Sequence, residues 1–234
     1  MMKRVIFFVT VLIFATIGLA AQESQEIAEA VETETSPAQT HTIDFVLQFT
    51  PAFYLNPGNE KVSGPSPVIT PITMGLLIPN KGFLAFQPTL SFFSMNHLWY
   101  DGNALPAEIE NRTSTTLSFL LTLPAVLTFD FKQTRIQLMP GIGIMARFAI
   151  LANNVKSEDS GYTGSAGSDL EEINKWFWSD GRFFYLTSEV SWLFNVSDKI
   201  KAGPVAGWYF PVVAFTKGKG FQGTIFSIGM KLSL

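Results

Sequence analysis

Few side chains in this sequence have the types and spacing that covalent chemistry requires. His97 has Ser94 three residues before it and Asp101 four residues after it, the residue types of a base, a nucleophile and an orienting acid. In an extended strand, however, Ser94 and His97 lie on opposite faces. The other histidine, His41, lies in a polar segment far from them. We therefore predict that the protein is not an enzyme.

Other kinds of reactive site are missing from the sequence. It contains no phosphate-binding loop, no metal-ligand spacing and no nucleophile elbow. It also contains no cysteine, which removes thiol nucleophiles, disulfides and cysteine-ligated zinc. We predict no catalytic residue, no cofactor and no metal.

Four charged residues stand out because they occur where apolar residues alternate with small or polar ones: Arg147, Glu189, Lys201 and Lys231. All four fall on the small and polar side of that alternation. If the segments are strands of a closed barrel, this side faces the interior, where a buried charge needs partners. The four charges then belong to a hydrogen-bonded plug, to a narrow, weakly cation-lined path for small solutes, or to a gate whose ion pairs can exchange.

The elements that would position these charges are eight period-two runs, which indicate β-strands with one large apolar face. The last run is the clearest, because Thr224, Phe226 and Ile228 alternate with Ile225 and Ser227 and the pattern continues to the last residue. The eight runs are residues 45–53, 67–78, 84–93, 116–129, 136–148, 184–195, 200–210 and 224–234.

Composition favours lipid as the partner of the apolar faces. The 234 residues include 22 Phe but only 15% charged residues, whereas soluble proteins carry about 25%. After residue 21 no window is apolar over the roughly 20 residues that a transmembrane helix needs, so a membrane span must be a closed β-barrel. A soluble lipocalin-like barrel would turn the apolar faces inward, but an eight-stranded interior has no room for so many large residues. We predict an all-β, eight-stranded antiparallel up-and-down transmembrane β-barrel.

The connections between the runs alternate in length. Short turns at residues 79–82, 130–134 and 197–199 alternate with long connections, which include Asn96 to Arg112 and Leu151 to Arg182. This is the pattern of a barrel with short periplasmic turns and long outer loops. The expected interfacial aromatic girdles are Tyr54, Trp99, Tyr100, Tyr185, Trp208 and Tyr209 near the long loops and Phe45, Phe83, Phe129 and Phe194 near the short turns. Six prolines within the runs predict bulges or bends, at Pro51, Pro71, Pro88, Pro124, Pro140 and Pro204.

Over residues 42–234 the pattern resembles the small eight-stranded outer-membrane barrels of Gram-negative-type bacteria, of the OmpA, OmpX and OmpW kind. The resemblance lies in the strand pattern rather than in a specific motif. It implies a place in the cell outer membrane, with outer-membrane lipid and the barrel-assembly machinery as partners. Such barrels usually end in an aromatic residue that the assembly machinery recognises, whereas Leu234 stands at that position here.

The amino-terminal segment indicates export. Lys3 and Arg4 precede an apolar stretch that ends in Ala20 and Ala21, which predicts a cleaved signal peptide over residues 1–21. An uncleaved anchor helix is the alternative. Residues 22–41 are polar and acidic without aromatic residues, so we predict a disordered periplasmic lead-in. Removal of two positive charges with the signal makes the net charge of −3 more negative, which excludes nucleic acid as a partner.

The longest connection contains a predicted helix and an aromatic triplet. Ser168 and Glu171 have capping-box spacing, and Leu170, Ile173 and Phe177 would share one helical face. Trp176, Phe177 and Trp178 form the candidate interaction site of this loop. Exposed residues of this kind usually rest on something, here the barrel mouth, lipid headgroups or a partner.

Two classes of function fit these observations. The first is an integral outer-membrane barrel with a structural role or with porin-like passage of small solutes. The alternative is an adhesin-like surface protein that binds an extracellular ligand through its long, surface-exposed loops. The two differ in a testable way, because exchange of the long loops should abolish partner binding and leave transport unchanged.

Overall fold

The structure is a computed structural model that describes residues 43–56, 66–79, 84–107, 113–152, 166–216 and 221–234. By its internal contacts the chain divides into two units, 1–40 and 41–234, and all described residues belong to the second. The predicted signal peptide and acidic lead-in therefore lie outside the described residues. Within the described residues, no helix is long and apolar enough to cross a membrane.

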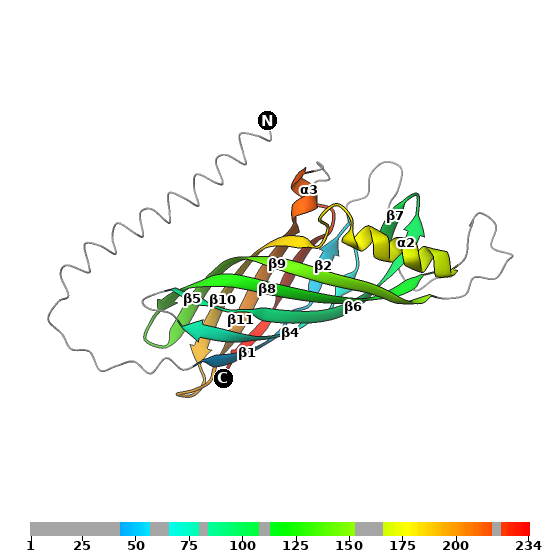
Figure 1. Ribbon diagram of the computed structural model, residues 1–234. Coiled ribbons are helices and arrows are strands. Elements are labelled where there is room, and N and C mark those ends of the chain that lie inside the picture. Colours follow the sequence, from blue (N-terminus) through cyan, green and yellow to red (C-terminus); the bar gives the residue numbers. More distant parts are fainter. Residues whose placement is uncertain (1–42, 57–65, 80–83, 108–112, 153–165, 217–220) are drawn as a thin grey trace. The chain divides into compact units, whose positions relative to one another are not determined.

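The second unit is an antiparallel barrel with eight staves, as the sequence predicts (Figure 1). Three staves consist of two strand segments each and five are single strands. In ring order the staves are β1 (Asp44–Phe49) with β2 (Ala52–Leu55), β3 (Val68–Ile69) with β4 (Ile72–Pro79), β5 (Leu84–Phe86) with β6 (Thr89–Tyr100), β8 (Ser114–Asp130), β9 (Thr134–Ala152), β10 (Phe184–Asn195), β11 (Lys201–Pro211) and β12 (Thr224–Ser233).

The barrel closes where the last strand meets the first. β12 pairs with β11 on one side and with β1 and β2 on the other, so that Met230 lies opposite Phe49 and Ile225 opposite Tyr54. The backbones of Phe45 and Leu234 exchange two hydrogen bonds, of 3.0 and 2.8 Å. With every stave paired on both sides, the predicted eight-stranded up-and-down fold is confirmed.

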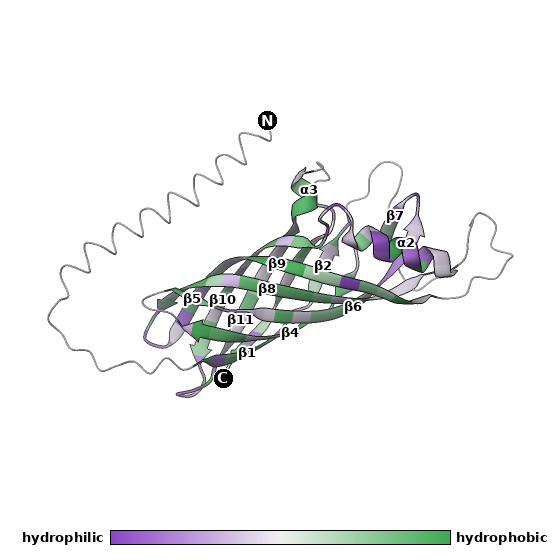
Figure 2. Ribbon diagram, in the orientation of Figure 1, coloured by the Kyte–Doolittle hydropathy of each residue, from purple (hydrophilic) through white to green (hydrophobic). Residues whose placement is uncertain are grey.

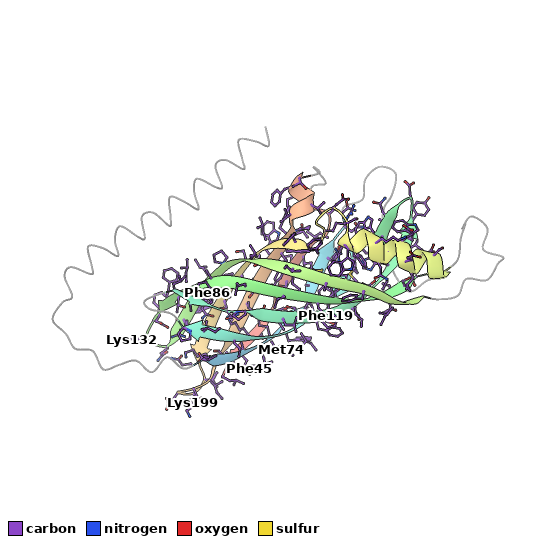
Figure 3. All side chains as sticks on the ribbon, viewed as in Figure 1. Phe45, Met74, Phe86, Phe119, Lys132 and Lys199 are labelled. Atoms are coloured by element: carbon purple, nitrogen blue, oxygen red, sulfur yellow. The ribbon has the colours of Figure 1, made fainter. Side chains whose placement is uncertain are left out.

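The two faces of the barrel differ in chemistry. Large apolar side chains cover the outside. Figure 2 shows that the strands are rich in apolar residues, and Figure 3 shows Phe45, Met74 and Phe86, which point away from the barrel. Inward positions hold buried polar and buried apolar residues in similar numbers. On β12, for example, Phe226 is exposed and the preceding Ile225 is buried. The strand phases predicted from the sequence are therefore correct.

The two ends of the barrel carry different features. The terminal rim is the end at which β1 begins and β12 finishes, and the turns with Lys132 and Lys199 lie there (Figures 1 and 3). The loop rim is the opposite end, where β7 (Asn103–Ala107), α2 (Ala166–Trp178) and α3 (Val212–Thr216) lie. This arrangement agrees with the predicted alternation of short turns and long connections.

The prolines have different effects in the first three staves and in the later, continuous strands. Pro51, Pro71 and Pro88 each separate the two segments of a stave, because proline cannot donate a ladder hydrogen bond. Pro124 and Pro140 lie instead inside the continuous strands β8 and β9, and Pro204 lies inside β11. The expectation was a bulge or a bend at each proline, and these three prolines are paired without a register shift, so no bulge occurs there. The register shift between β8 and β9 falls at residues 115–116, away from any proline.

Glycines accommodate some of these prolines. Gly141 faces Pro124 across the β8–β9 pair, and a Cβ atom on Gly141 would lie 2.5 Å from Pro124 Cα. Likewise, a Cβ atom on Gly75 would lie 2.6 Å from the carbonyl oxygen of Pro88. The absence of a side chain thus lets the backbones approach where the ladder is irregular.

The loop rim contains a hairpin that the sequence pattern did not indicate. β6 continues to Tyr100 and pairs with β7 through a turn at Asp101 and Gly102, which have φ values of 46° and 69°. Two consecutive positive φ values are typical of a type I′ hairpin, for which Asp-Gly is a preferred sequence. The predicted break of the strand pattern at residues 96–112 is therefore wrong over residues 96–107.

The predicted aromatic girdles are only partly formed. At the loop rim Tyr100 and Trp208 are exposed and Trp99 is partly buried against the cluster under α2, but Tyr54, Tyr185 and Tyr209 are buried inside the barrel. These three tyrosines occupy the inward phase of their strands, so their hydroxyls contribute to interior hydrogen bonds. At the terminal rim Phe45, Phe129 and Phe194 are exposed, and Phe83 lies outside the described residues.

Candidate functional site

Near the terminal rim, the interior of the barrel is closed by a network around Lys231. This side chain is 1% exposed, and its Nζ donates to Gln87 Oε1 at 2.6 Å and to Gln137 Oε1 at 2.8 Å. Ser191 also donates to Gln137 Oε1, at 3.2 Å. Three staves are thereby linked across the lumen to β12. The ammonium group is held by neutral amide oxygens.

A second network surrounds Glu189, the buried acid of β10. Its carboxylate accepts a hydrogen bond from the Tyr209 hydroxyl at 2.6 Å and one from Gln48 Nε2 at 3.3 Å. Gln48 lies directly opposite Lys231 in the β1–β12 pair, so the two networks are neighbours. Gly207 faces Glu189 in the β10–β11 pair and leaves room for these side chains.

Above these networks an apolar layer fills the lumen toward the loop rim. Its buried members come from staves around the barrel and include Phe93, Leu120, Met145, Tyr185 and Ile225. At this layer the structure contains a cavity of about 10 Å³, which is about the space of one water molecule. Side chains of the two networks and of the apolar layer therefore cross the described lumen.

Helix α2 covers the loop rim and is attached there by Asn174. The Asn174 amide hydrogen-bonds the backbone N–H and C=O of Ala149, at 2.9 and 3.1 Å, and also donates to the Leu170 carbonyl. Ile173 and Phe177 are fully buried against Ala104 and Ala149. The helix and its apolar face are thus as predicted. It begins at Ala166, however, so Ser168 lies in its first turn and not at the N-cap.

The aromatic triplet divides between two environments. Phe177 is 1% exposed, and its ring lies edge-on to His97 at 4.9 Å, with the guanidinium of Arg147 4.4 Å from the ring centre. Trp176 is partly buried beside Arg182, whose guanidinium carbon lies 4.3 Å from its ring. These two residues contact the barrel mouth.

Trp178, the third member, faces the outside of the barrel. It is 44% exposed and its ring centre lies 6.0 Å from Phe148 and 5.8 Å from Phe183. Trp178 therefore extends the apolar outer face at the loop rim. Of the three alternatives for the triplet, contact with the barrel mouth therefore holds for Trp176 and Phe177, whereas lipid headgroups or a partner stay predictions for Trp178.

Two arginines meet under α2. Arg147 is buried and donates to the Tyr54 hydroxyl at 3.3 Å and to the Arg182 carbonyl at 3.1 Å. Arg182 forms an ion pair with Asp180 at 2.9 Å and donates to Trp176 and Ser179 at the end of α2. Burial lowers the pKa of Arg182, and the nearby Asp180 carboxylate opposes that shift.

A small cavity of about 30 Å³ lies between these arginines and α3. Its polar wall includes Arg147, Arg182, Asn56 and Trp176, and its apolar wall includes Val213. Buried nitrogen atoms of Asn56, Arg147 and Trp176 have no hydrogen-bond partner among the described residues. These three nitrogen atoms are themselves enclosed by protein atoms.

The four charges predicted to face inward have different surroundings. Arg147, Glu189 and Lys231 are buried in the lumen, whereas Lys201, the first residue of β11, is only partly buried at the terminal rim. The three interior charges do not form one cluster, because Arg147 belongs to the mouth.

Ser94 and His97 lie on opposite faces of β6, and His97 Nδ1 is 3.0 Å from the Thr116 hydroxyl.

Sequence reasoning missed the neutral residues that hold these charges. Gln48, Gln87 and Gln137 occupy inward positions of their strands. A glutamine on the face that points into the barrel, like Lys231, was therefore the signal that the sequence offered. Asn174 and Arg182 had no such signal. Their roles depend on the position of α2 over the barrel, which the strand pattern does not specify.

Two comparisons by sequence, with known protein families and with curated proteins, find no match. Solved structures of similar fold include Neisserial surface protein A, with 7% identity over 82% of this chain and 96% of that chain and a TM-score of 0.49. They also include the Yersinia pestis outer membrane protein Ail in phospholipid bilayer nanodiscs. In that case identity is 6% over 82% of this chain and all of that chain, and the TM-score is 0.39.

Proposed function

We propose that this chain is an integral protein of the bacterial outer membrane, with a closed barrel that serves a structural, non-enzymatic role. Support for the membrane comes from the exposed apolar face. Ile142 in the middle of β9 is 62% exposed, and Ile228 in the middle of β12 is 59% exposed. Water does not favour a surface of this kind around a whole barrel, whereas lipid does.

The closed interior is the observation that carries the structural role. Passage of small solutes requires an aqueous path, but the Lys231 and Glu189 networks span the lumen and an apolar layer lies above them. A transport role would need these hydrogen bonds to exchange while the barrel stays intact. The observed partners therefore favour a plug over a gate.

The test is conductance of the signal-free protein refolded into planar bilayers, combined with solute flux into liposomes. We expect a folded, heat-modifiable barrel that conducts no current. The Glu189→Ala and Arg147→Ala variants should also be silent, because removal of one side chain leaves the apolar layer in place. Reproducible openings that either substitution alters would overturn the structural role and support a pore.

A second candidate is interaction with a ligand or another cell through the loop rim. The specific observation in its favour is the fixed position of α2, which is packed on β9 and presents Trp178 outside. Replacement of residues 153–181 by a short turn should then abolish binding and leave membrane insertion unchanged. Unchanged binding by the shortened protein would exclude this surface.

A further inference from the structure

A row of aromatic rings crosses the outer surface of the barrel toward the loop rim. Phe92 lies opposite Phe119 in the β6–β8 pair, with 5.2 Å between the ring centres. The ring of Phe119 lies 6.5 Å from that of Phe148 on β9, which lies 6.0 Å from Trp178 at the end of α2. Trp178 continues the row to Phe183, 5.8 Å away and just before β10. Neighbouring rings thus join three strands of the barrel to the loop-rim helix.

The chemistry of the outer surface changes at this row. On its terminal side the next outward residues are apolar, Leu90 on β6 and Leu121 on β8, which are 40% and 54% exposed. On its loop side β6 presents Ser94 and Asn96, and the Asn96 amide oxygen accepts a hydrogen bond from Thr115 of β8 at 3.2 Å. Polar side chains of this kind are disfavoured in hydrocarbon but not in water or among lipid headgroups. The row therefore lies where the hydrocarbon of a bilayer would end.

The exposed charges of α2 indicate that the helix lies in water beyond this boundary. Glu171 and Lys175 form an ion pair at 2.9 Å, and their side chains are 69% and 61% exposed. Trp178, one turn after Lys175, is 44% exposed and touches the row of rings. Tryptophan combines a large apolar ring with a polar N–H group, so it is enriched where lipid meets water.

We propose that Trp178 inserts into the boundary between the headgroups and the hydrocarbon of the outer leaflet. The rings of Phe92, Phe119 and Phe148 lie at the same boundary, and the β6–β7 hairpin and the charged part of α2 lie in water beyond it. Lipid rather than a partner protein is the occupant, because the row is continuous with the lipid-facing residues of β8 and β9. The inference rests on the proposed function and adds the residues that fix the depth of insertion.

Fluorescence quenching by brominated lipids tests the position of Trp178. The refolded protein is placed in vesicles whose lipids carry bromine either near the headgroup or near the end of the acyl chain. Single substitutions identify each contribution: Trp178→Phe, the control Trp176→Phe, and Trp208→Phe, which removes an outward ring of β11 that is 49% exposed. Trp178→Phe should remove fluorescence that is quenched mainly by bromine near the headgroup.

The other two variants separate this proposal from the membrane location. Trp176→Phe should leave the lipid-quenched fluorescence unchanged, because Trp176 is partly buried at the barrel mouth beside Arg182. Loss of lipid quenching in Trp208→Phe but not in Trp178→Phe would overturn the proposal and keep the membrane barrel. Quenching of Trp178 mainly by bromine at the chain ends would also overturn it. A wild-type protein that no lipid quenches would refute the membrane location as well.

The absence of cysteine from the chain allows a second measurement that leaves Trp178 in place. Leu90→Cys and Ser94→Cys put a thiol on either side of Phe92, about 13 Å apart along the outward face of β6. The reactive form of a thiol is the thiolate, which apolar surroundings disfavour, so a membrane-impermeant maleimide should label Ser94→Cys about tenfold faster or more than Leu90→Cys. Equal labelling of the two variants, in vesicles that quench Trp208, would contradict a boundary at Phe92. Heat-modifiable mobility checks that every variant is folded.

Discussion

Asn174 takes the place of a strand beside Ala149. Its side-chain amide accepts from the Ala149 N–H at 2.9 Å and donates to the Ala149 carbonyl at 3.1 Å. β10 begins at Phe184, which faces Ile144, so in the described residues no β10 partner reaches this part of β9. One side chain thus satisfies an exposed strand edge and attaches α2 to it.

Replacement of Asn174 by Leu should release α2 from the barrel. The substitution removes the partners of both Ala149 backbone groups, which we expect to cost the docked state about 1 to 3 kcal/mol. Limited proteolysis should then cut within residues 166–178, and tryptophan fluorescence should shift to the red as Trp176 becomes exposed.

The matched control for this prediction is Lys175→Gln on the exposed face of the same helix. It removes ion pairs with Glu171 and Glu172, which are solvent-exposed and contribute little. The control should therefore keep the wild-type cleavage pattern. Equal protection of Asn174→Leu and the control would show that the apolar contacts alone hold the helix.

Replacement of Lys231 by Met should destabilise the barrel. Met fills a similar volume but leaves Gln87 Oε1 and Gln137 Oε1 without the ammonium donor, so we expect a loss of about 1 to 3 kcal/mol. Urea unfolding in detergent measures it. Lys199→Met, in the exposed turn between β10 and β11, should change stability by less than about 0.5 kcal/mol. A Lys231 variant as stable as this control would contradict the importance of the plug.

The strands were predictable because their faces differ so strongly. A large apolar residue at every second position, such as Phe226, Ile228 and Met230 in β12, fixes the phase of a strand and with it the inward position of Lys231. The same pattern in β10 fixes the inward position of Glu189. The hairpin at Asp101 and Gly102 was missed because β7 contains Pro106 and lacks a large apolar face. Its Asp-Gly turn was the available local signal.

The mouth of the barrel was harder to predict for a different reason. Period-two patterns describe one strand and its two faces, whereas the contacts of Asn174 and Arg182 depend on how a connecting helix folds back over the rim. The inward phase of Tyr54 was visible in the sequence. Tyrosine is enriched at membrane interfaces, so Tyr54 was predicted to lie in the outer girdle. Its hydroxyl instead lies inside the barrel, where it accepts a hydrogen bond from Arg147.

Gly141→Ala should be more damaging than Gly143→Ala. The new Cβ atom at residue 141 would lie 2.5 Å from the backbone of Pro124, which cannot move without disturbing β8. At residue 143 the nearest atoms are a Leu120 methyl and the Leu121 carbonyl oxygen, both at 3.2 Å, so a shift of a few tenths of an ångström relieves the contact. We expect Gly141→Ala to cost about 1 kcal/mol or more beyond Gly143→Ala in urea unfolding. Equal costs would show that the β8–β9 pair adapts at Pro124.

Ile142→Lys tests whether lipid surrounds the barrel. Ile142 is 62% exposed in the middle of β9, with Leu123 and Leu186 beside it in the adjacent strands. In water a lysine here would change little, but at the midplane of a bilayer it should cost about 2 to 4 kcal/mol.

Val196→Lys is the control, since Val196 is 67% exposed but lies in the turn after β10 at the terminal rim. Unfolding in liposomes should separate the two variants by at least about 2 kcal/mol, because only residue 142 would lie deep in the hydrocarbon. Equal stabilities would argue against a barrel embedded in lipid at this depth.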